Sequence, residues 1–301
     1  MMEGGPVRLD PLLSLLLALC CCLPGRGMAA PEILRLEKSL YRNVLVYEEN
    51  HLRCMKFGAH DTGRQTCVSL KDPEALVFNP PKMLLAALYL RPNPGRVLVI
   101  GLGGGTVTVT LQKLFPELPI DSVEIDPAVV KVAKEFFGFV PGKNTRVFVD
   151  DGRVFVKHAL RQKRKYDLVI LDAFDHISVP EHMTTREYLL EIRGLMEPGG
   201  VFAANTFSSG RLYDAESATY FAVFGGFYNL KVFNRVILAQ PGGLPDMETI
   251  RRNAEGLEGK FQPFSTGKGW LLPLFASHPR WPPQTRLLTD QYSPANLLNG
   301  R

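Results

Sequence analysis

The feature that most constrains the fold is an alternation of short apolar runs with stretches of helical spacing from residue 97 onward. Such alternation is typical of βαβ units, in which the strands lie parallel and helices cover both faces of the sheet. We expect strands at 97–100, 120–126, 145–151, 166–174 and 199–207, and helices at about 105–115, 127–137, 152–162, 184–196 and 214–224. The sequence therefore predicts an α/β fold with a mostly parallel sheet.

The segments outside this alternation have patterns of their own. Residues 40–70 contain three short β-like runs separated by turns, which predicts a small three-stranded meander. Residues 72–90 change to helical spacing, with a Pro-Pro pair that suits a helix start. Two later apolar runs, 228–239 and 269–277, are expected to close the sheet. The glycine-containing segment 241–268 is expected to be a mobile insertion or a long hairpin connection.

The turn after the first strand of this alternation is rich in glycine. Ligands of open α/β sheets bind at the carboxyl ends of the strands, so this turn is expected at the binding site. Neither the P-loop pattern nor the dinucleotide pattern G-x-G-x-x-G matches. The G-x-G-x-G spacing of Gly101, Gly103 and Gly105 instead suits an adenosyl group with a small amino-acid-like tail. Glycines that serve only tight packing are the alternative interpretation.

Acidic residues end the following strands. They are Glu124, Asp151, Asp172 and, three residues later, Asp175. At these positions Glu124 is expected to accept hydrogen bonds from both ribose hydroxyls, and Asp151 from an adenine amino group. Acids at strand ends also cap helices, and Asp126 and Asp150 are expected to do so. Taken together, the acids predict a nucleoside site.

Composition and charge limit the classes of partner. The net charge is +5, and the Lys and Arg residues are spread rather than gathered in a stripe, so no nucleic-acid partner is expected. Only two of the five cysteines, Cys54 and Cys67, lie in the body of the chain, and no CxxC pair or metal-ligand cluster is present. We expect both to be reduced structural thiols, with a hairpin disulfide as the alternative, and no metal site.

Residues 1–30 form a leader that is excluded from the fold prediction. The apolar run at 11–23 has the length of a signal-peptide core and is too short for a comfortable membrane span. Met28 begins a stretch that reads as an ordinary cytosolic start. The leader is therefore a signal, an anchor or a misassigned start. We expect a cytoplasmic protein, with export or membrane anchoring left open.

Five stretches are specific as a group: VLVIGLGGG, VEIDPAVVKVAKEFF, VFVDDGRVFV, YDLVILDAFD and LTDQYSPANLL. Together they resemble the spermidine synthase family of polyamine aminopropyltransferases over roughly residues 40–298. The nearest branch is one also found fused to membrane transporters, in which a segment like VPEHMTTREY follows the fourth strand. The resemblance implies a Rossmann-like class I methyltransferase-type nucleotide fold. It implies a small N-terminal β-region over 31–78 and an adenosyl-binding catalytic domain over 79–301.

The resemblance also implies how the donor is held. The donor would be decarboxylated S-adenosylmethionine, a co-substrate, and no prosthetic group is implied. Gly101, Gly103 and Gly105 would line its methylthioadenosine part. Glu124 would hold the ribose and Asp151 the adenine.

On the acceptor side, the resemblance implies a small amine such as putrescine. Asp172 and Asp175 match the family's D-x-x-D, which grips the reacting amines and helps to deprotonate the attacking one; Asp172 also contributes to the donor site. His176 and His182 flank this side, as proton acceptors or as solvent-facing loop residues. Family members commonly dimerise, which implies a homodimer.

Several positions depart from the family's pattern, mainly on the polyamine side. Where the family has an acid inside the glycine loop, this chain has Gly104, and where the family has a glutamine, this chain has Asn205. The family's tyrosine aligns near residues 79–81, where this chain has Asn-Pro-Pro. Three hypotheses therefore stay open. They are an aminopropyltransferase that acts on a diamine, an S-adenosylmethionine-dependent methyltransferase, and a non-catalytic module that binds an adenosyl nucleoside.

Overall fold

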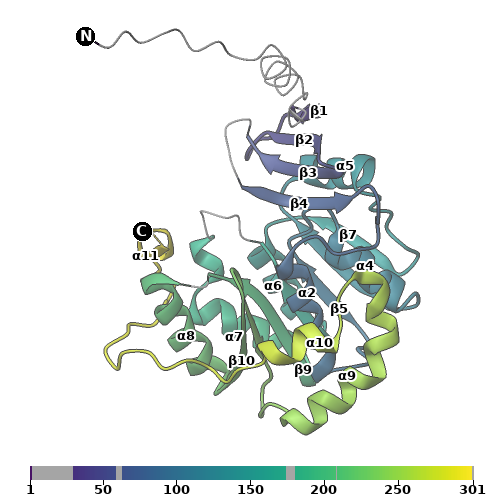
Figure 1. The fold of residues 1–301 in the computed structure, drawn as a ribbon. Helices are drawn as coiled ribbons and strands as arrows, with labels where there is room; N and C mark the ends of the chain where they lie inside the picture. The colour runs from purple at the N-terminus through teal and green to yellow at the C-terminus, as the bar shows by residue number, and fades with distance from the viewer. Residues whose placement is uncertain (2–29, 59–62, 174–179, 208, 300–301) are drawn as a thin grey trace. The chain divides into compact units, whose positions relative to one another are not determined.

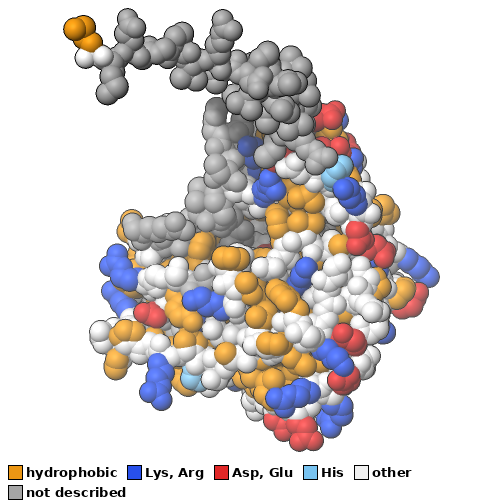
Figure 2. Space-filling model, viewed as in Figure 1, with side chains coloured by type: hydrophobic (Ala, Val, Ile, Leu, Met, Phe, Trp, Pro, Cys, Tyr) orange, Lys and Arg blue, Asp and Glu red, His pale blue; other side chains and the backbone are white. Residues whose placement is uncertain are grey.

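The computed structural model describes residues 1, 30–58, 63–173, 180–207 and 209–299. The chain divides into two units, Met1–Pro31 and Glu32–Arg301, and the helices and strands named below all belong to the second unit. No helix within the described ranges is long and apolar enough to span a membrane. On the face seen in Figure 2, Lys and Arg side chains are scattered among Asp and Glu, in keeping with the charge pattern of the sequence.

The main sheet has seven strands in the order β10-β11-β9-β8-β5-β6-β7. They are β5 (Val97–Ile100), β6 (Ile120–Glu124), β7 (Thr145–Val149), β8 (Tyr166–Leu171), β9 (Met196–Thr206), β10 (Phe227–Lys231) and β11 (Arg235–Ala239). The five strands β5 to β9 run parallel, and β11 and β10 pair antiparallel at one edge. The predicted α/β fold with a mostly parallel sheet is confirmed. The strand order reverses between β5 and β8, and this places a binding crevice at their carboxyl ends.

Helices cover both faces of this sheet (Figure 1). They are α4 (Thr106–Leu114), α5 (Pro127–Phe136), α6 (Gly152–Arg161), α7 (Arg186–Leu195), α8 (Gly210–Phe224) and α9 (Met247–Phe261). One hydrophobic core lies between the sheet and α4 and α9, together with the short helices α2 (Asn79–Leu85) and α3 (Ala87–Leu90). A second core lies between the sheet and α6, α7 and α8. Because both faces are buried, β5 and β8 are apolar along almost their whole length.

The N-terminal region is a four-stranded antiparallel sheet rather than the predicted three-stranded meander. Its strands, in spatial order, are β1 (Glu32–Glu37), β2 (Val44–Glu49), β3 (Leu52–Phe57) and β4 (Arg64–Ser69). The sequence did not indicate β1 because this edge strand is largely exposed and has no buried apolar face. Apolar residues of β2 and β3 pack on α5, which joins this sheet to the nucleotide fold.

The expectation of reduced thiols at Cys54 and Cys67 is wrong. The two residues lie directly opposite each other on β3 and β4, with their Cα atoms 4.1 Å apart, and they form a disulfide. The hairpin disulfide named as the alternative is therefore the one present. The pairing depends on the register of two strands, which cysteine spacing alone does not give.

Two predictions beyond β11 also need correction. Most of segment 241–268 is helix α9, which Asp246 caps and which buries Ile250, Ala254, Leu257 and Phe261. The run 269–277 forms no strand, and only its end pairs with the sheet, through an isolated antiparallel bridge from Ser277 to Tyr228 of β10. It forms α10 (Lys268–Leu271) and a 3₁₀ turn at Leu272–Leu274, since Pro273 cannot donate to a sheet ladder.

The predicted helix in 72–90 begins at Asn79 and is divided at Ala86 into α2 and α3.

Candidate active site

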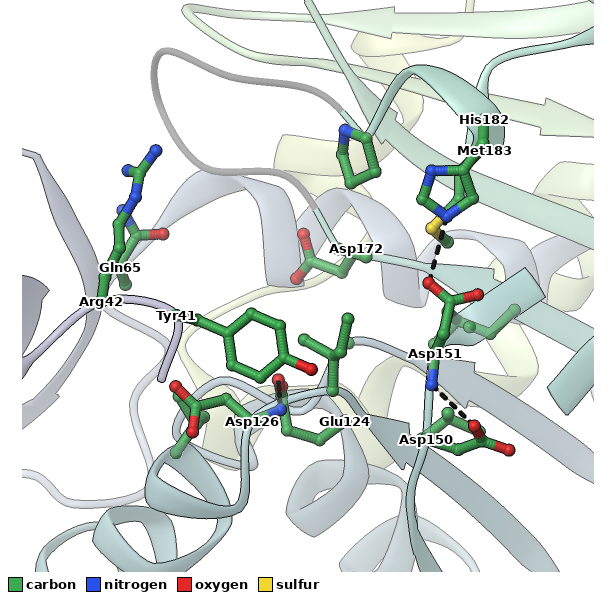
Figure 3. A pocket seen from close by; sticks show the side chains of 18 of the residues that line it. Tyr41, Arg42, Gln65, Glu124, Asp126, Asp150, Asp151, Asp172, His182 and Met183 are labelled. Carbon is green, nitrogen blue, oxygen red and sulfur yellow. Dashed lines mark hydrogen bonds and ion pairs between the residues drawn. The ribbon is translucent and has the colours of Figure 1, made fainter. Parts of the chain in front are cut away.

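A cavity of about 370 Å³ opens at the carboxyl ends of β5, β6, β7 and β8 (Figure 3). Four of the residues predicted for the site line it: Gly101, Glu124, Asp151 and Asp172. Gly103 and Gly105 do not line it. Asp175 lies outside the described residues, as does His176.

The glycines of the turn have structural reasons of their own. A Cβ atom on Gly101 would lie 2.2 Å from the backbone oxygen of Asp172, so only glycine lets the ends of β5 and β8 approach this closely. Gly105 begins α4 with φ of +83°, and a Cβ there would meet the ring of Phe139 at 2.8 Å. The packing interpretation accounts for these two glycines, while Gly101 also forms part of the cavity wall.

Glu124, at the end of β6, is fixed by the backbone of the glycine turn. Its Oε2 accepts from Leu102 N at 3.0 Å and Gly103 N at 3.4 Å, and its Oε1 accepts from Asp126 N at 3.1 Å. Burial raises the pKa of this carboxyl, and the three backbone donors act in the opposite direction by favouring the ionised form. The result is a carboxylate with a fixed orientation at the cavity wall.

Asp151, which follows β7, both caps a helix and faces the cavity. Its Oδ1 accepts from Arg153 N and Val154 N, each at 2.9 Å, which makes it the N-cap of α6. Its Oδ2 lies 3.1 Å from Nε2 of His182. The expectation that Asp150 caps this helix is wrong, because Asp150 Oδ1 instead accepts from the backbone N of Asp151. The predicted cap at Asp126 is confirmed by its bond from Ala128 N.

His182 was expected beside the acceptor, but it lines the cavity at Asp151 (Figure 3). It belongs to a 3₁₀ turn, Glu181–Met183, whose Met183 is buried against the same wall. Its side chain is 48% exposed, so the ring is open to the cavity and to solvent.

Asp172, at the end of β8, lies where two cavities adjoin. Its Oδ1 accepts a hydrogen bond from Asn205 Nδ2 at 2.9 Å. Burial raises the pKa of Asp172, and the bond from Asn205 partly opposes this by favouring the carboxylate. A buried carboxylate at the end of a parallel strand is suited to accept a proton from a bound substrate.

The second cavity, of about 530 Å³, shares Gly101, Gln65 and Asp172 with the first. Its other polar lining is largely neutral: Thr66, Asn79, Thr106, Asn205 and Asn234. Among its described lining residues Asp172 is the one carboxylate and Arg64 the one cation, and Arg64 pairs with Glu49 at 2.7 Å. Phe78 and Phe233 add apolar surface.

Several lining residues were not predicted from the sequence. Tyr41, Arg42, Phe57 and Gln65 come from the N-terminal sheet and its connections, and Asn296 comes from the C-terminal segment. In Figure 3 the ring of Tyr41 lies beside Glu124 and Asp126. No local motif marks these positions, because they reach the cavity only through packing between distant parts of the chain.

Gly104, which stands at the acid's place in the family pattern, is covered by β4. A Cβ atom there would lie 2.4 Å from Cγ2 of Thr66. An acid at position 104 would therefore require the Thr66 side chain to move, and residues 101–105 provide no carboxylate to the cavity.

Comparisons with known proteins agree with this geometry. The sequence model of the spermine/spermidine synthase domain matches residues 82–223. A polyamine aminopropyltransferase of Vibrio vulnificus is 43% identical over 299 residues, which cover 97% of this chain and 100% of the relative.

Two solved structures share the fold. Spermidine synthase from Thermotoga maritima superposes with a TM-score of 0.60 at 19% identity, over 81% of this chain and 84% of that chain. Human methyltransferase-like protein 13, solved in complex with SAH, gives a TM-score of 0.55 at 26% identity, over 60% of this chain and 91% of that chain. The predicted Rossmann-like methyltransferase-type fold and the aminopropyltransferase class are confirmed. The chain belongs to the spermine/spermidine synthase family.

Proposed function

We propose that the first cavity binds decarboxylated S-adenosylmethionine, with the ribose at Glu124 and the adenine at Asp151. The single observation that carries this proposal is that Glu124, Asp151 and Asp172 line one cavity at the switch point of the sheet. The wall also contains apolar side chains such as Ile100, which suit a nucleoside. The likeness to a polyamine aminopropyltransferase supports the choice of donor.

We infer that the second cavity receives the acceptor, a small diamine such as putrescine. Asp172 lines both cavities and is therefore suited to contact the donor arm and the incoming amine together. Asp175, three residues further along, is the second carboxylate of this proposal. The neutral amides of the second cavity offer carbonyl oxygens to an ammonium group without adding charge.

The reaction is a nucleophilic displacement at carbon. The neutral amine of the acceptor attacks the aminopropyl carbon beside the sulfonium, a C–N bond forms and the C–S bond breaks. The electron pair of that bond stays on sulfur, so the leaving group is neutral methylthioadenosine. The proton lost by the attacking nitrogen passes to one of the two proposed carboxylates, Asp172 or Asp175. In-line alignment of the two substrates provides much of the remaining acceleration.

We propose a cytoplasmic location, because the donor is an intracellular nucleoside. The Cys54–Cys67 disulfide is the feature that favours an oxidising compartment instead, and the leader leaves export or membrane anchoring open. Fractionation of cells that express the full chain separates the two. A homodimer is also proposed, and sedimentation of the purified chain tests it.

The proposed function is tested by titration followed by turnover. Calorimetry compares decarboxylated S-adenosylmethionine, S-adenosylmethionine and methylthioadenosine, and mass spectrometry then follows the reaction with putrescine. We expect the decarboxylated donor to bind most tightly, and methylthioadenosine and an aminopropylated product to form together. Asp175→Asn should abolish turnover and leave binding. Preference for the carboxylated donor would favour methyl transfer, and binding without product would favour a non-catalytic module.

A further inference from the structure

Three sequence motifs far apart in the chain meet at one side chain. They are the VDDGR that opens α6, the VPEHMTT segment after β8, and the closing LTDQY. The side chain is that of Arg153, in the first turn of α6, which is 7% exposed. The proposed function assigns no role to Arg153 or to the closing motif.

All five N–H groups of the Arg153 side chain are used. Nε and Nη2 donate to the two carboxylate oxygens of Glu191 at 2.9 and 3.0 Å. Nη1 and Nη2 donate to the two oxygens of Asp290 at 2.7 and 2.8 Å, across 137 residues of sequence. Nη1 also donates to the backbone oxygen of His182 at 3.0 Å. Such paired, bidentate geometry fixes a guanidinium in one place.

These bonds make Arg153 part of a closed cycle of contacts with Asp151 and His182, the two polar residues at the proposed adenine end of the cavity. Its backbone N donates to Oδ1 of Asp151, and Oδ2 of Asp151 contacts the ring of His182. The backbone of His182 in turn accepts from the Arg153 side chain. The carboxylate and the imidazole are therefore held toward each other from both ends by one residue.

Asp290 provides part of the counter-charge that this buried cation needs. The bond from Arg153 lowers the pKa of Asp290, which keeps the carboxylate ionised. Thr185 Oγ1 also donates to Asp290 at 2.7 Å. The C-terminal segment has further attachments to the same turn, since Ser293 Oγ donates to the backbone oxygen of Glu181 at 2.8 Å. The C-terminal segment is thus bonded to the turn that carries His182, which lines the first cavity.

We infer that Arg153, with Asp290 as its counter-charge, is a positioning residue that sets the selectivity of the cavity for a 6-amino purine. This inference rests on the proposed function, because it takes Asp151 as the partner of the base. A carboxylate accepts from an exocyclic amino group and repels a 6-oxo group, so discrimination depends on where Asp151 and His182 are held. Loosening the Arg153 clamp lets the pair shift and weakens that discrimination.

The test uses the full chain with Asp290→Asn, and methylthioadenosine and methylthioinosine as ligands in calorimetry. Asp290 is 43% exposed, so its substitution is compatible with folding, and thermal melting checks this. We expect the unmodified chain to prefer the adenine nucleoside, and Asp290→Asn to reduce the ratio of the two affinities by about tenfold. Asp290→Glu should restore part of the ratio. The control is Glu255→Gln, a partner of Lys268 on α9 and α10, which should change nothing.

The outcomes separate the two proposals. If the unmodified chain binds neither nucleoside, the proposed function fails. If it binds selectively and Asp290→Asn weakens both ligands equally, so that the ratio stays constant, Asp290 has only a structural role and the inference is overturned.

Discussion

The two cavities that meet at Asp172 differ in how their polar groups are arranged. The first has carboxylates at the ends of β6, β7 and β8, and Glu124, Asp150 and Asp151 are each held by backbone N–H groups. The second is lined mainly by neutral amides, hydroxyls and apolar side chains, and Asp172 is its one carboxylate among the described lining residues. Apart from the shared Asp172, the carboxylates of the two cavities therefore all lie in the first cavity.

This difference indicates which side the fold holds more rigidly. Carboxylates fixed by backbone donors provide acceptors in set directions, as recognition of a nucleoside requires. A wall of neutral groups selects less strongly for the charge of its ligand, because an amide can present either a donor or an acceptor. We therefore expect substitutions in the first cavity to affect donor binding, and substitutions around Asp172 to affect the chemical step.

Among substitutions of residues that the structure describes, the largest effect is expected from Asp172→Asn, at the junction of the cavities. The amide cannot take the proton of the attacking amine, so kcat should fall by about 10²–10⁴-fold. Affinity for methylthioadenosine, measured by calorimetry, should change by less than about threefold. Initial rates of methylthioadenosine release provide the measurement. Turnover close to that of the unmodified chain would contradict the role given to Asp172.

Glu124→Gln should weaken methylthioadenosine binding by about 10–100-fold. The carboxylate accepts backbone bonds on both oxygens, so either orientation of the amide sets an NH₂ group against an N–H donor. Asp150→Asn is the matched control, since it lines the same cavity and keeps Oδ1 as the acceptor for Asp151 N. Equal loss in both variants would show that charge in general, rather than the geometry of Glu124, governs binding.

Asn205→Ala should shift the acid limb of the kcat/KM profile to higher pH. The bond from Asn205 favours the ionised form of Asp172, so its removal raises the pKa of Asp172 further above its ordinary value. A higher pH is then needed for the same fraction of carboxylate. The rate should therefore fall on the acid side of the profile and stay unchanged at high pH. If the acid limb stays in place, the hydrogen bond from Asn205 does not influence the pKa of Asp172, and this prediction is contradicted.

The smallest effect on catalysis is expected from loss of the Cys54–Cys67 disulfide in the double variant Cys54→Ser/Cys67→Ser. Its removal should cost about 2–4 kcal/mol of stability, which lowers Tm by about 5–15 °C. Turnover at low temperature should change by less than about threefold, although Gln65 of β4 lines both cavities. Scanning calorimetry and peptide mapping provide the measurements, and two unlinked cysteine peptides from the non-reduced protein would contradict the disulfide.

How much could be predicted from the sequence depends on how each feature is encoded. The parallel strands and their helices are marked by local apolar runs, and the observed bounds of β5 to β9 lie close to those expected. The acids of the first cavity were found because the end of a parallel strand fixes their place. Helix α9 was missed because its apolar residues are sparse among charged and glycine residues, and only packing on the sheet makes their spacing decisive.

The parts that escaped prediction depend on contacts between distant segments. Tyr41 and Gln65 reach the cavity because β2 and β3 pack on α5, and no motif records that packing. The cap at Asp151 rather than Asp150 depends on the local geometry at the start of α6, which a strand-end acid pattern does not resolve to one residue. The bond between Arg153 and Asp290 joins two motifs that were each visible in the sequence, although their contact was not.

The most direct test of the central claim, that the first cavity is the nucleoside site, is a crystal structure of the full chain with methylthioadenosine. We expect the ribose hydroxyls on Glu124, the adenine beside Asp151 and His182, and the sulfur directed toward Asp172. A nucleoside bound in the second cavity, or one that leaves Glu124 and Asp151 without contact, would contradict the account.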